Sequence, residues 1–278
     1  MTSPNETAKV AVVGAGNIGS RHLQALVKFD QPLEIHVVDP SPDALGRAAA
    51  GLGAVASNEH VSVCYLGEVS SLPPTLDVAI VATTSKERRG VIEAMLEGTK
   101  VRFLILEKVL FPFPADYGAV AALLRDKSVV AYVNCAQWLY PFYQRLRNEI
   151  GGAGPVEVQV SGSSWHLATN CIHYLDLAAY LSGRTDVRLD HVDIDEIADD
   201  PRYGGSVDFF GSVRGVFGDG STVSVRSFKA GDAPVTVTIR TADRLCIVVE
   251  RLRRAWVYDN DSSWARAKRR RRCRARAR

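Results

Sequence analysis

The sequence predicts an α/β protein: a doubly wound parallel sheet in the first half, then an α+β region with a largely antiparallel, open sheet. Two observations lead to this division. Up to about residue 133, apolar strand-like runs alternate with helical segments, which is typical of parallel sheets with crossover helices. Beyond residue 155, most segments alternate apolar and polar side chains, as half-buried antiparallel strands do.

The composition is that of a soluble globular enzyme with room for two domains. The 278 residues are 46% hydrophobic and 23% charged. No run approaches the roughly 18 consecutive apolar residues of a membrane span, and the N-terminus lacks the features of a signal peptide. Five scattered cysteines without a C-x-x-C pair favour reduced thiols. We therefore expect a cytoplasmic protein with no membrane partner.

A strand, a glycine-rich turn and a helix open the chain. The apolar run 10–13 leads into Gly14, Gly16 and Gly19, and an apolar-periodic helix follows. Gly14 permits a tight turn, Gly16 lets backbone approach a pyrophosphate, and Gly19 lets helix and strand pack closely. The start of the helix directs free N–H groups and its positive dipole end at phosphates. A glycine-rich turn in an unrelated α/β domain is the alternative, and the strand and helix on either side favour cofactor binding over it. The predicted phosphate-binding residues are Gly14, Gly16, Asn17, Ile18 and Gly19.

Asp39 follows a second predicted strand, 33–38, and lies 20 positions after Gly19. At this spacing, a carboxylate accepts hydrogen bonds from the ribose 2′- and 3′-hydroxyls of NAD and repels the 2′-phosphate of NADP. No arginine follows until Arg47. The sequence therefore favours NAD over NADP.

Further elements define two predicted domains, residues 1–150 and 151–260. The first domain is completed by helices at 43–52, 86–96, 115–125 and 141–150 and by strands at 61–65, 77–82, 101–106 and 129–133. The second follows the flexible joint 151–155, with a helix at 170–181 ending at Gly183 and strands at 156–162, 206–217, 222–228, 235–241 and 244–250. A hairpin turn is expected at 218–220.

Polar residues are predicted at the carboxyl ends of the parallel strands, where open α/β sheets bind ligands. They are Thr83, Thr84, Glu107, Lys108 and Asn134. A hydride transfer needs a proton acceptor for a substrate hydroxyl, and Lys108 follows a buried strand that would partly desolvate it. A solvated loop charge explains a lysine beside a glutamate equally well.

The predicted helix of the second domain offers a second polar set. His173 and Asp176 are three residues apart, so they share one helix face, where the carboxylate could orient the imidazole. Trp165, His166 and Asn170 could shape a polar, stackable sugar pocket upstream. A capping histidine and an exposed aspartate would be the simpler interpretation of the helix alone.

The other histidines receive lesser roles, and no metal site is expected. His22 is expected to pack locally, His36 to lie in a strand, and His60 and His191 to lie in loops. No cluster of His, Cys, Asp and Glu has the spacing of metal ligands.

These features together resemble the Gfo/Idh/MocA oxidoreductases. The loop 14–22 resembles that family's opening, and Ala82–Arg88 resembles its A-T-P-x-x-x-H segment, with Thr84 for Pro and Arg88 for His. Glu107-Lys-Val109 resembles E-K-P, and 170–176 matches the H-x-x-D end of D-x-G-x-H-x-x-D. Segments 107–111, 132–135 and 165–176 are similar to members from bacterial surface-sugar and nonulosonic-acid gene sets.

The resemblance, which covers residues 8–255, implies a Rossmann domain and an NAD(P)-dependent reaction on a sugar, cyclitol or nucleotide sugar. It implies that Lys108 and His173 are an acid/base pair, with Lys108 also touching the cofactor. Asp176 would assist substrate binding, and Asn134 and Asn170 would contact the sugar. A non-catalytic sensor that binds dinucleotide or sugar is the alternative, and the open sheet suggests a homo-oligomer.

The C-terminal residues 261–278 form a basic tail. Nine of the 34 Lys and Arg lie in 266–278, which leaves 25 basic against 31 acidic side chains elsewhere. Such a tail can bind nucleic acid, or it can be the product of a shifted GC-rich reading frame that replaces the family's closing segment. The acidic body and the lack of a nucleic-acid module favour the second origin, a disordered tail and a chain of reduced stability or activity.

Overall fold

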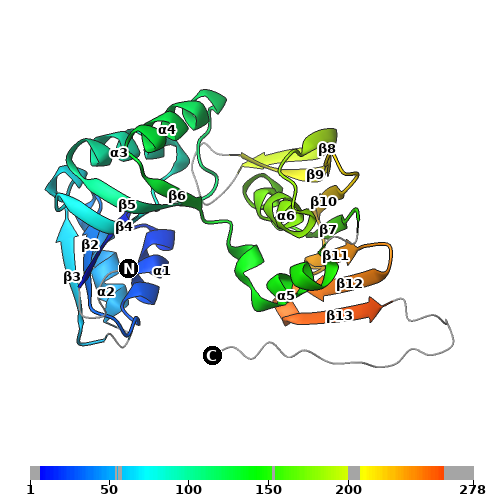
Figure 1. Ribbon diagram of the computed structural model, residues 1–278, viewed down its shortest axis with the longest axis horizontal. Helices are drawn as coiled ribbons and strands as arrows, with labels where there is room; N and C mark the ends of the chain where they lie inside the picture. The colour runs from blue at the N-terminus through cyan, green and yellow to red at the C-terminus, as the bar shows by residue number, and fades with distance from the viewer. Residues whose placement is uncertain (1–6, 54, 56–57, 152–153, 200–206, 260–278) are drawn as a thin grey trace. The chain divides into compact units, whose positions relative to one another are not determined.

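The computed structural model describes residues 7–53, 55, 58–151, 154–199 and 207–259 (Figure 1). They form two compact units, divided between Asn134 and Cys135, and each unit is described by itself. This division lies earlier in the chain than the predicted boundary after residue 150. Helix α5 (Pro141–Ile150) belongs to the second unit, because its residues Tyr143 and Leu146 lie in the core of that unit. The predicted basic tail lies outside the described residues.

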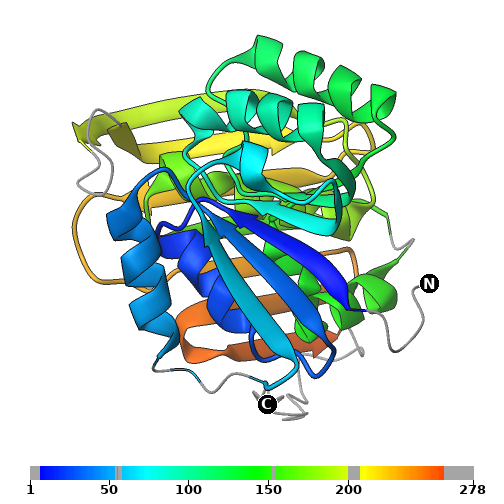
Figure 2. The same ribbon diagram turned by 90° about the vertical axis from the view of Figure 1, so that its left-hand side faces the viewer.

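The first unit is a six-stranded parallel sheet in the order β3-β2-β1-β4-β5-β6, which confirms the predicted doubly wound sheet. Figure 2 shows its first strands, in blue to cyan, running side by side. The strands are β1 (Ala8–Val13), β2 (Leu33–Val38), β3 (Val61–Leu66), β4 (Thr75–Val81), β5 (Lys100–Leu106) and β6 (Val130–Val133). The helices are α1 (Asn17–Leu26), α2 (Pro42–Leu52), α3 (Ser85–Gly98) and α4 (Pro114–Asp126), with a 3₁₀ turn η1 (Val69–Ser71).

Both faces of this sheet are buried, and strand β1 shows why its residues are apolar throughout. Val10 and Val12 pack in a core with residues of α1 and α2. The alternate residues Ala11 and Val13 pack in a second core with residues of α3 and α4. Since successive side chains of a strand point to opposite faces, a strand covered on both sides needs an unbroken apolar run.

The second unit is a seven-stranded sheet in the order β13-β12-β11-β7-β10-β9-β8. Its pairs are antiparallel except β7 with β10, so the predicted mostly antiparallel sheet is confirmed. The strands are β7 (Glu157–Ser163), β8 (Arg188–Asp199), β9 (Val207–Val216), β10 (Thr222–Phe228), β11 (Thr236–Arg240), β12 (Arg244–Val249) and β13 (Arg254–Asp259). Helix α6 (Leu167–Ser182) and α5 cover one face, with 3₁₀ turns η2 (Ala136–Leu139) and η3 (Glu250–Leu252).

Two edge strands of this sheet, β8 and β13, were not predicted. Strand β8 is exposed along most of its length and rich in aspartate, a residue that is depleted in strands, so its pattern resembles a loop. His191 consequently lies in β8 and not in a loop. Helix α6 also begins earlier than predicted, at Leu167, and ends as expected at Gly183, whose φ is 72°. Among the described residues, no helix is long and apolar enough to span a membrane.

Candidate active site

The strand ends of the first unit are tied together at the carboxyl edge of its sheet. The Gly14 amide donates to the Val38 carbonyl at 2.8 Å, and the Asn134 amide donates to Leu106 at 2.8 Å. The Ala82 amide donates to Val13 at 2.7 Å, at the switch point between β1 and β4. The glycine loop, Thr83, Lys108 and Asn134 therefore follow strand ends at one edge, where doubly wound sheets bind ligands.

The three glycines of the loop differ in why a side chain is absent at their positions. Gly14 has a φ of +98°, and a Cβ there would lie 2.9 Å from the Ala82 carbonyl carbon. A Cβ on Gly19 would lie 1.8 Å from the Gly14 oxygen. A Cβ on Gly16 would meet nothing within 4 Å. The fold thus requires Gly14 and Gly19, whereas exposed Gly16 leaves open space in which a ligand can approach the backbone.

Helix α1 begins directly after this open position. Its N-cap, Gly16, supplies no side-chain hydrogen bond, and its first turn contains no acidic residue. Asn17 is exposed, and Ile18 is 46% exposed. The first N–H groups and the positive end of the helix dipole therefore face outward, which suits a pyrophosphate.

Asp39 lies against the glycine loop. One carboxylate oxygen accepts the Ala15 amide hydrogen bond at 2.8 Å, and the other accepts from the Ser41 amide at 2.9 Å. The side chain is partly exposed. Because the carboxylate is fixed beside the predicted phosphate site, it is in place to meet a ribose diol and would repel a 2′-phosphate. This geometry fits NAD.

Glu107 is the centre of a buried polar network at the end of β5. Its Oε1 accepts hydrogen bonds from His22 Nε2 at 2.7 Å and from Asn134 Nδ2 at 2.5 Å. Burial would raise the pKa of this carboxyl, but the bonds from His22 and Asn134 and the nearby Arg88 charge hold the pKa below its usual value. The carboxylate is thus charged and held in one orientation, on the residue before Lys108.

The prediction that His22 packs locally is therefore wrong. His22 reaches from α1 across to the end of β5. Its position could have been recognised, because His22 follows Gly19 by three residues and so lies on the helix face that this glycine packs against the sheet.

Arg88 holds the segment that carries Lys108. Its guanidinium donates to the carbonyl oxygens of Thr83, Glu107, Val109 and Leu110 at 2.5–2.9 Å, and the residue is 2% exposed. Burial lowers its pKa to about 10, against the opposing effect of Glu107. The Lys108–Val109 peptide bond is cis. Two of the departures from the family motifs, at 88 and 109, thus meet in one set of hydrogen bonds.

The two threonines after β4 differ in environment. Thr84 is exposed at the N-cap of α3 and makes no capping bond with its side chain. The Thr83 hydroxyl is buried and has no hydrogen-bond partner among the described residues. Since buried hydroxyls are usually hydrogen-bonded, Thr83 offers a polar group for a ligand at this edge.

Helix α6 of the second unit carries the other predicted residues. His173 and Asp176 are half-buried, and burial raises the pKa of the Asp176 carboxyl. Asp176 Oδ2 is buried with no hydrogen-bond partner among the described residues. Asn170 donates from its amide to the Trp165 carbonyl at 2.8 Å. These side chains share one helix face because they are spaced by three.

Trp165 is mainly a core residue. It is 8% exposed, packs edge-to-face against Tyr174 with ring centroids 5.3 Å apart, and donates its indole N–H to the Arg226 carbonyl at 2.9 Å. Its indole N–H is thus engaged within the protein. Any contact of Trp165 with a sugar would be made by the exposed part of the ring.

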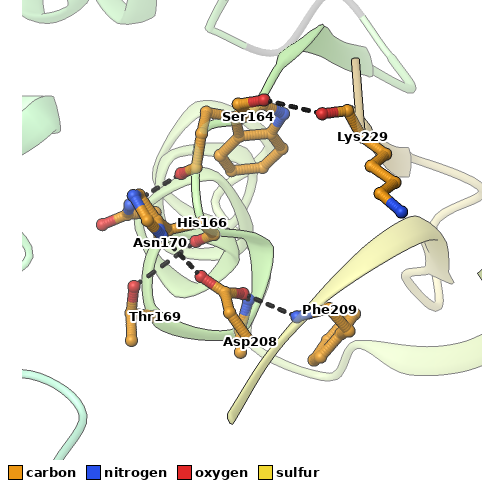
Figure 3. A network of polar contacts seen from close by, with 9 residues as sticks. Ser164, His166, Thr169, Asn170, Asp208, Phe209 and Lys229 are labelled. Carbon is orange, nitrogen blue, oxygen red and sulfur yellow. Dashed lines mark hydrogen bonds and ion pairs between the residues drawn. The ribbon is translucent and has the colours of Figure 1, made fainter. Parts of the chain in front are cut away.

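Two carboxylates of the second unit, Asp208 and Glu250, were not predicted from the sequence as members of polar networks. Asp208 binds His166 (Figure 3). Glu250 accepts hydrogen bonds from Tyr143 at 3.2 Å and from Tyr174 at 3.0 Å, and burial raises its pKa. The partners of each carboxylate lie far away in the chain, so no local motif marks them.

The first unit is a dinucleotide-binding domain by its sheet order, glycine loop and Asp39. Residues 8–135 match the Gfo/Idh/MocA family profile, described as an oxidoreductase family with an NAD-binding Rossmann fold. This part of the chain is therefore similar to the NAD-binding domain of that family. The predicted family, the oxidoreductase class and NAD as cofactor are confirmed. No curated protein sequence matches the chain.

Solved structures similar to this chain extend over both units. A UDP-N-acetylglucosamine 3-dehydrogenase from Acidithiobacillus ferrooxidans is 18% identical, with a TM-score of 0.71 over 93% of this chain and 79% of that one. An oxidoreductase from Agrobacterium radiobacter, in complex with NAD+, L-tartaric acid and magnesium, is 18% identical, with a TM-score of 0.67 over 92% and 78%. A myo-inositol dehydrogenase from Lactobacillus casei, in complex with NAD(H) and myo-inositol, is 17% identical, with a TM-score of 0.64 over 85% and 72%. The two-unit fold is therefore shared with these proteins.

Proposed function

We propose that this oxidoreductase transfers a hydride between NAD and a hydroxyl-bearing carbon of a sugar, cyclitol or nucleotide sugar. The observation that carries the proposal is Lys108, held by Arg88 and set beside the charged Glu107 network at the carboxyl edge of the NAD-binding sheet. The similar structures of a nucleotide-sugar dehydrogenase and a cyclitol dehydrogenase support this substrate class.

The first unit binds and orients the cofactor in this proposal. Gly16 and the N–H groups of Asn17 and Ile18 bind the pyrophosphate, and Asp39 binds the ribose diol. Thr83, Thr84, Glu107 and Lys108 line the nicotinamide end. Bound NAD supplies the hydride acceptor or donor at this edge.

The second unit contributes to the substrate side. Lys108 and His173 act as the acid/base pair that removes or returns the hydroxyl proton while the hydride moves. Asp176 orients His173 or the substrate, and the further sugar contacts come from Asn134, Trp165 and Asn170. The surface-sugar subgroup, the cytoplasmic location and the homo-oligomer stay predictions.

The test is NAD+ reduction with myo-inositol and UDP-N-acetylglucosamine, followed at the nicotinamide absorbance. Lys108→Ala and His173→Ala are each expected to lower kcat by about 10²–10⁴-fold. The matched controls Lys86→Ala, exposed on α3, and His191→Ala, exposed on β8, should keep wild-type rates. Turnover that survives both active-site substitutions would refute the proposal. Tight binding of NAD and polyol without turnover in wild type would instead identify the non-catalytic sensor.

A further inference from the structure

His166 and Asp208 form a side-chain pair that the proposed reaction does not use (Figure 3). His166 Nδ1 lies 2.9 Å from Asp208 Oδ2, and the two residues are 42 positions apart. The other carboxylate oxygen accepts from the amides of Ala168 and Phe209, both at 2.8 Å. The Asp208 side chain, 6% exposed, is thus fixed by three donors.

This arrangement defines which ring nitrogen of His166 can meet a ligand. An ionised carboxylate is only an acceptor, so Nδ1 carries the hydrogen that it shares with Asp208. In the neutral ring, Nε2 is then the acceptor. The His166 side chain is 39% exposed, and no hydrogen bond from another described residue reaches Nε2. The ring therefore presents a fixed acceptor to the outside.

The backbone that presents this ring is unusual. His166 has a φ of 58° and Ser164 a φ of 51°, so two residues other than glycine adopt the left-handed conformation within three positions. Such conformations are unfavourable for residues other than glycine, and they cluster at functional sites. They turn the chain at the start of α6, with Asn170 and His173 following on the helix after about one and two turns.

We propose that His166 contacts the substrate, and that its Nε2 accepts a hydrogen bond from a hydroxyl or amide N–H of a sugar substituent. Asp208 is its positioning residue. The inference rests on the proposed function, which puts the reacting hydroxyl at His173. Seven residues of helix separate the two histidines by about 10 Å along the axis. His166 therefore reads a group other than the reacting hydroxyl and would determine substrate specificity.

His166→Asn separates this role from helix capping. Asparagine tolerates the left-handed backbone, and its amide N–H can replace Nδ1–H toward Asp208, but it has nothing at the place of Nε2. Asp208→Asn reverses the polarity, because its amide donates toward Nδ1 and leaves Nε2 protonated. His191→Asn, on exposed β8, is the matched control.

The experiment measures NAD+ reduction with myo-inositol and UDP-N-acetylglucosamine, and long-range ¹H–¹⁵N spectra of the imidazoles. We expect KM for the preferred polyol to rise about five- to tenfold in His166→Asn and Asp208→Asn, with kcat within threefold and NAD affinity unchanged. In wild type, the polyol should shift the Nε2 resonance of an Nδ1–H tautomer, and Asp208→Asn should change that tautomer.

An unchanged KM in folded His166→Asn, or an Nε2 resonance unmoved by saturating polyol, would overturn the inference. If wild type turns over NAD+ and loses activity with Lys108→Ala, the proposed function survives that result. Conversely, turnover that is indifferent to Lys108 and His173 contradicts the proposed function, whereas the response of the Nε2 resonance to polyol still reports on His166 alone.

Discussion

The two units bury acidic side chains in opposite electrostatic situations. In the first unit, Glu107 accepts from His22 and Asn134 and lies near the Arg88 charge, and its pKa is lowered. In the second, Asp176 and Glu250 have raised pKa values, because burial there is not offset by a neighbouring cation. Glu107 is thus compensated within the first unit, whereas Asp176 Oδ2 in the second has no hydrogen-bond partner among the described residues.

This difference follows the division of labour in the proposal. A nucleotide site serves one constant ligand, so the bonds that Glu107 accepts can hold that side chain rigid before the ligand arrives. A substrate site gains from groups that complete their hydrogen bonds with the ligand, as Asp176 Oδ2 can do.

The largest effect on stability is expected from Arg88→Met. This change leaves four buried or partly buried carbonyl oxygens without their donor and should lower the free energy of unfolding by about 3–5 kcal/mol in urea denaturation. The neighbouring Arg89→Met removes solvent-screened ion pairs with Glu93 and Asp116 and should lower the free energy of unfolding far less. Equal losses would show that Arg88 is not a structural clamp.

Gly19→Ala should be the next largest. Its Cβ would lie 1.8 Å from the Gly14 oxygen, so the loop must shift, at a cost of about 1–3 kcal/mol of unfolding free energy and a loss of NAD binding by calorimetry. Gly16→Ala has open space and should change stability by less than about 1 kcal/mol while still weakening NAD binding. Unchanged NAD affinity in Gly16→Ala would argue against pyrophosphate binding there.

A smaller effect separates the two acidic clusters at pH 8. Glu107→Gln removes a charge that has partners and should lower the free energy of unfolding by about 1–2 kcal/mol. Glu250→Gln should cost less than about 1 kcal/mol, because its surroundings already favour the neutral form. A greater loss for Glu250→Gln in the same denaturation assay would reverse the comparison.

The smallest effect is a pH dependence of opposite sign in the two units. The lowered pKa of Glu107 gives stability that is present above the usual carboxyl pKa and is lost as pH falls through the lowered value. The raised pKa of Glu250 gives stability that is present below the usual value and is lost as pH rises through the raised one. Melting temperatures of wild type and the two glutamine variants across acidic to neutral pH should therefore diverge in opposite directions, and parallel curves would contradict this.

The sequence predicted the first unit closely because its signals are local. Buried parallel strands are continuous apolar runs, and Gly14, Gly19 and Asp39 stand at spacings that the nucleotide fold demands. The contacts that complete the site are not local. Arg88 donates to carbonyls about 20 positions away, and His166 finds Asp208 on a distant strand. Backbone acceptors leave no residue signature, so only the folded chain reveals these partners.

Strand β8 was missed for a related reason, and its acids are not isolated in the fold. Arg214 pairs with Asp190, Arg226 Nη2 lies 2.6 Å from Asp195, and Lys229 Nζ lies 2.6 Å from Glu196. Three of the five acids of this edge strand therefore take their cation from the chain after it. The local sequence around β8 contains the acids but not these cations, so it predicts a loop.

The sheet face opposite α6 has a consequence for self-association. In the central strands, the residues that alternate with the buried valines are hydroxyl, amide and charged side chains, such as Gln159, Ser224 and Arg226. Two copies of the chain that met at these strands would form hydrogen bonds and ion pairs and not an apolar interface. Salt screens such exposed charges, and the Debye screening length is about 10 Å at an ionic strength of 0.1 M. A dimer joined through these central strands would consequently weaken as ionic strength rises.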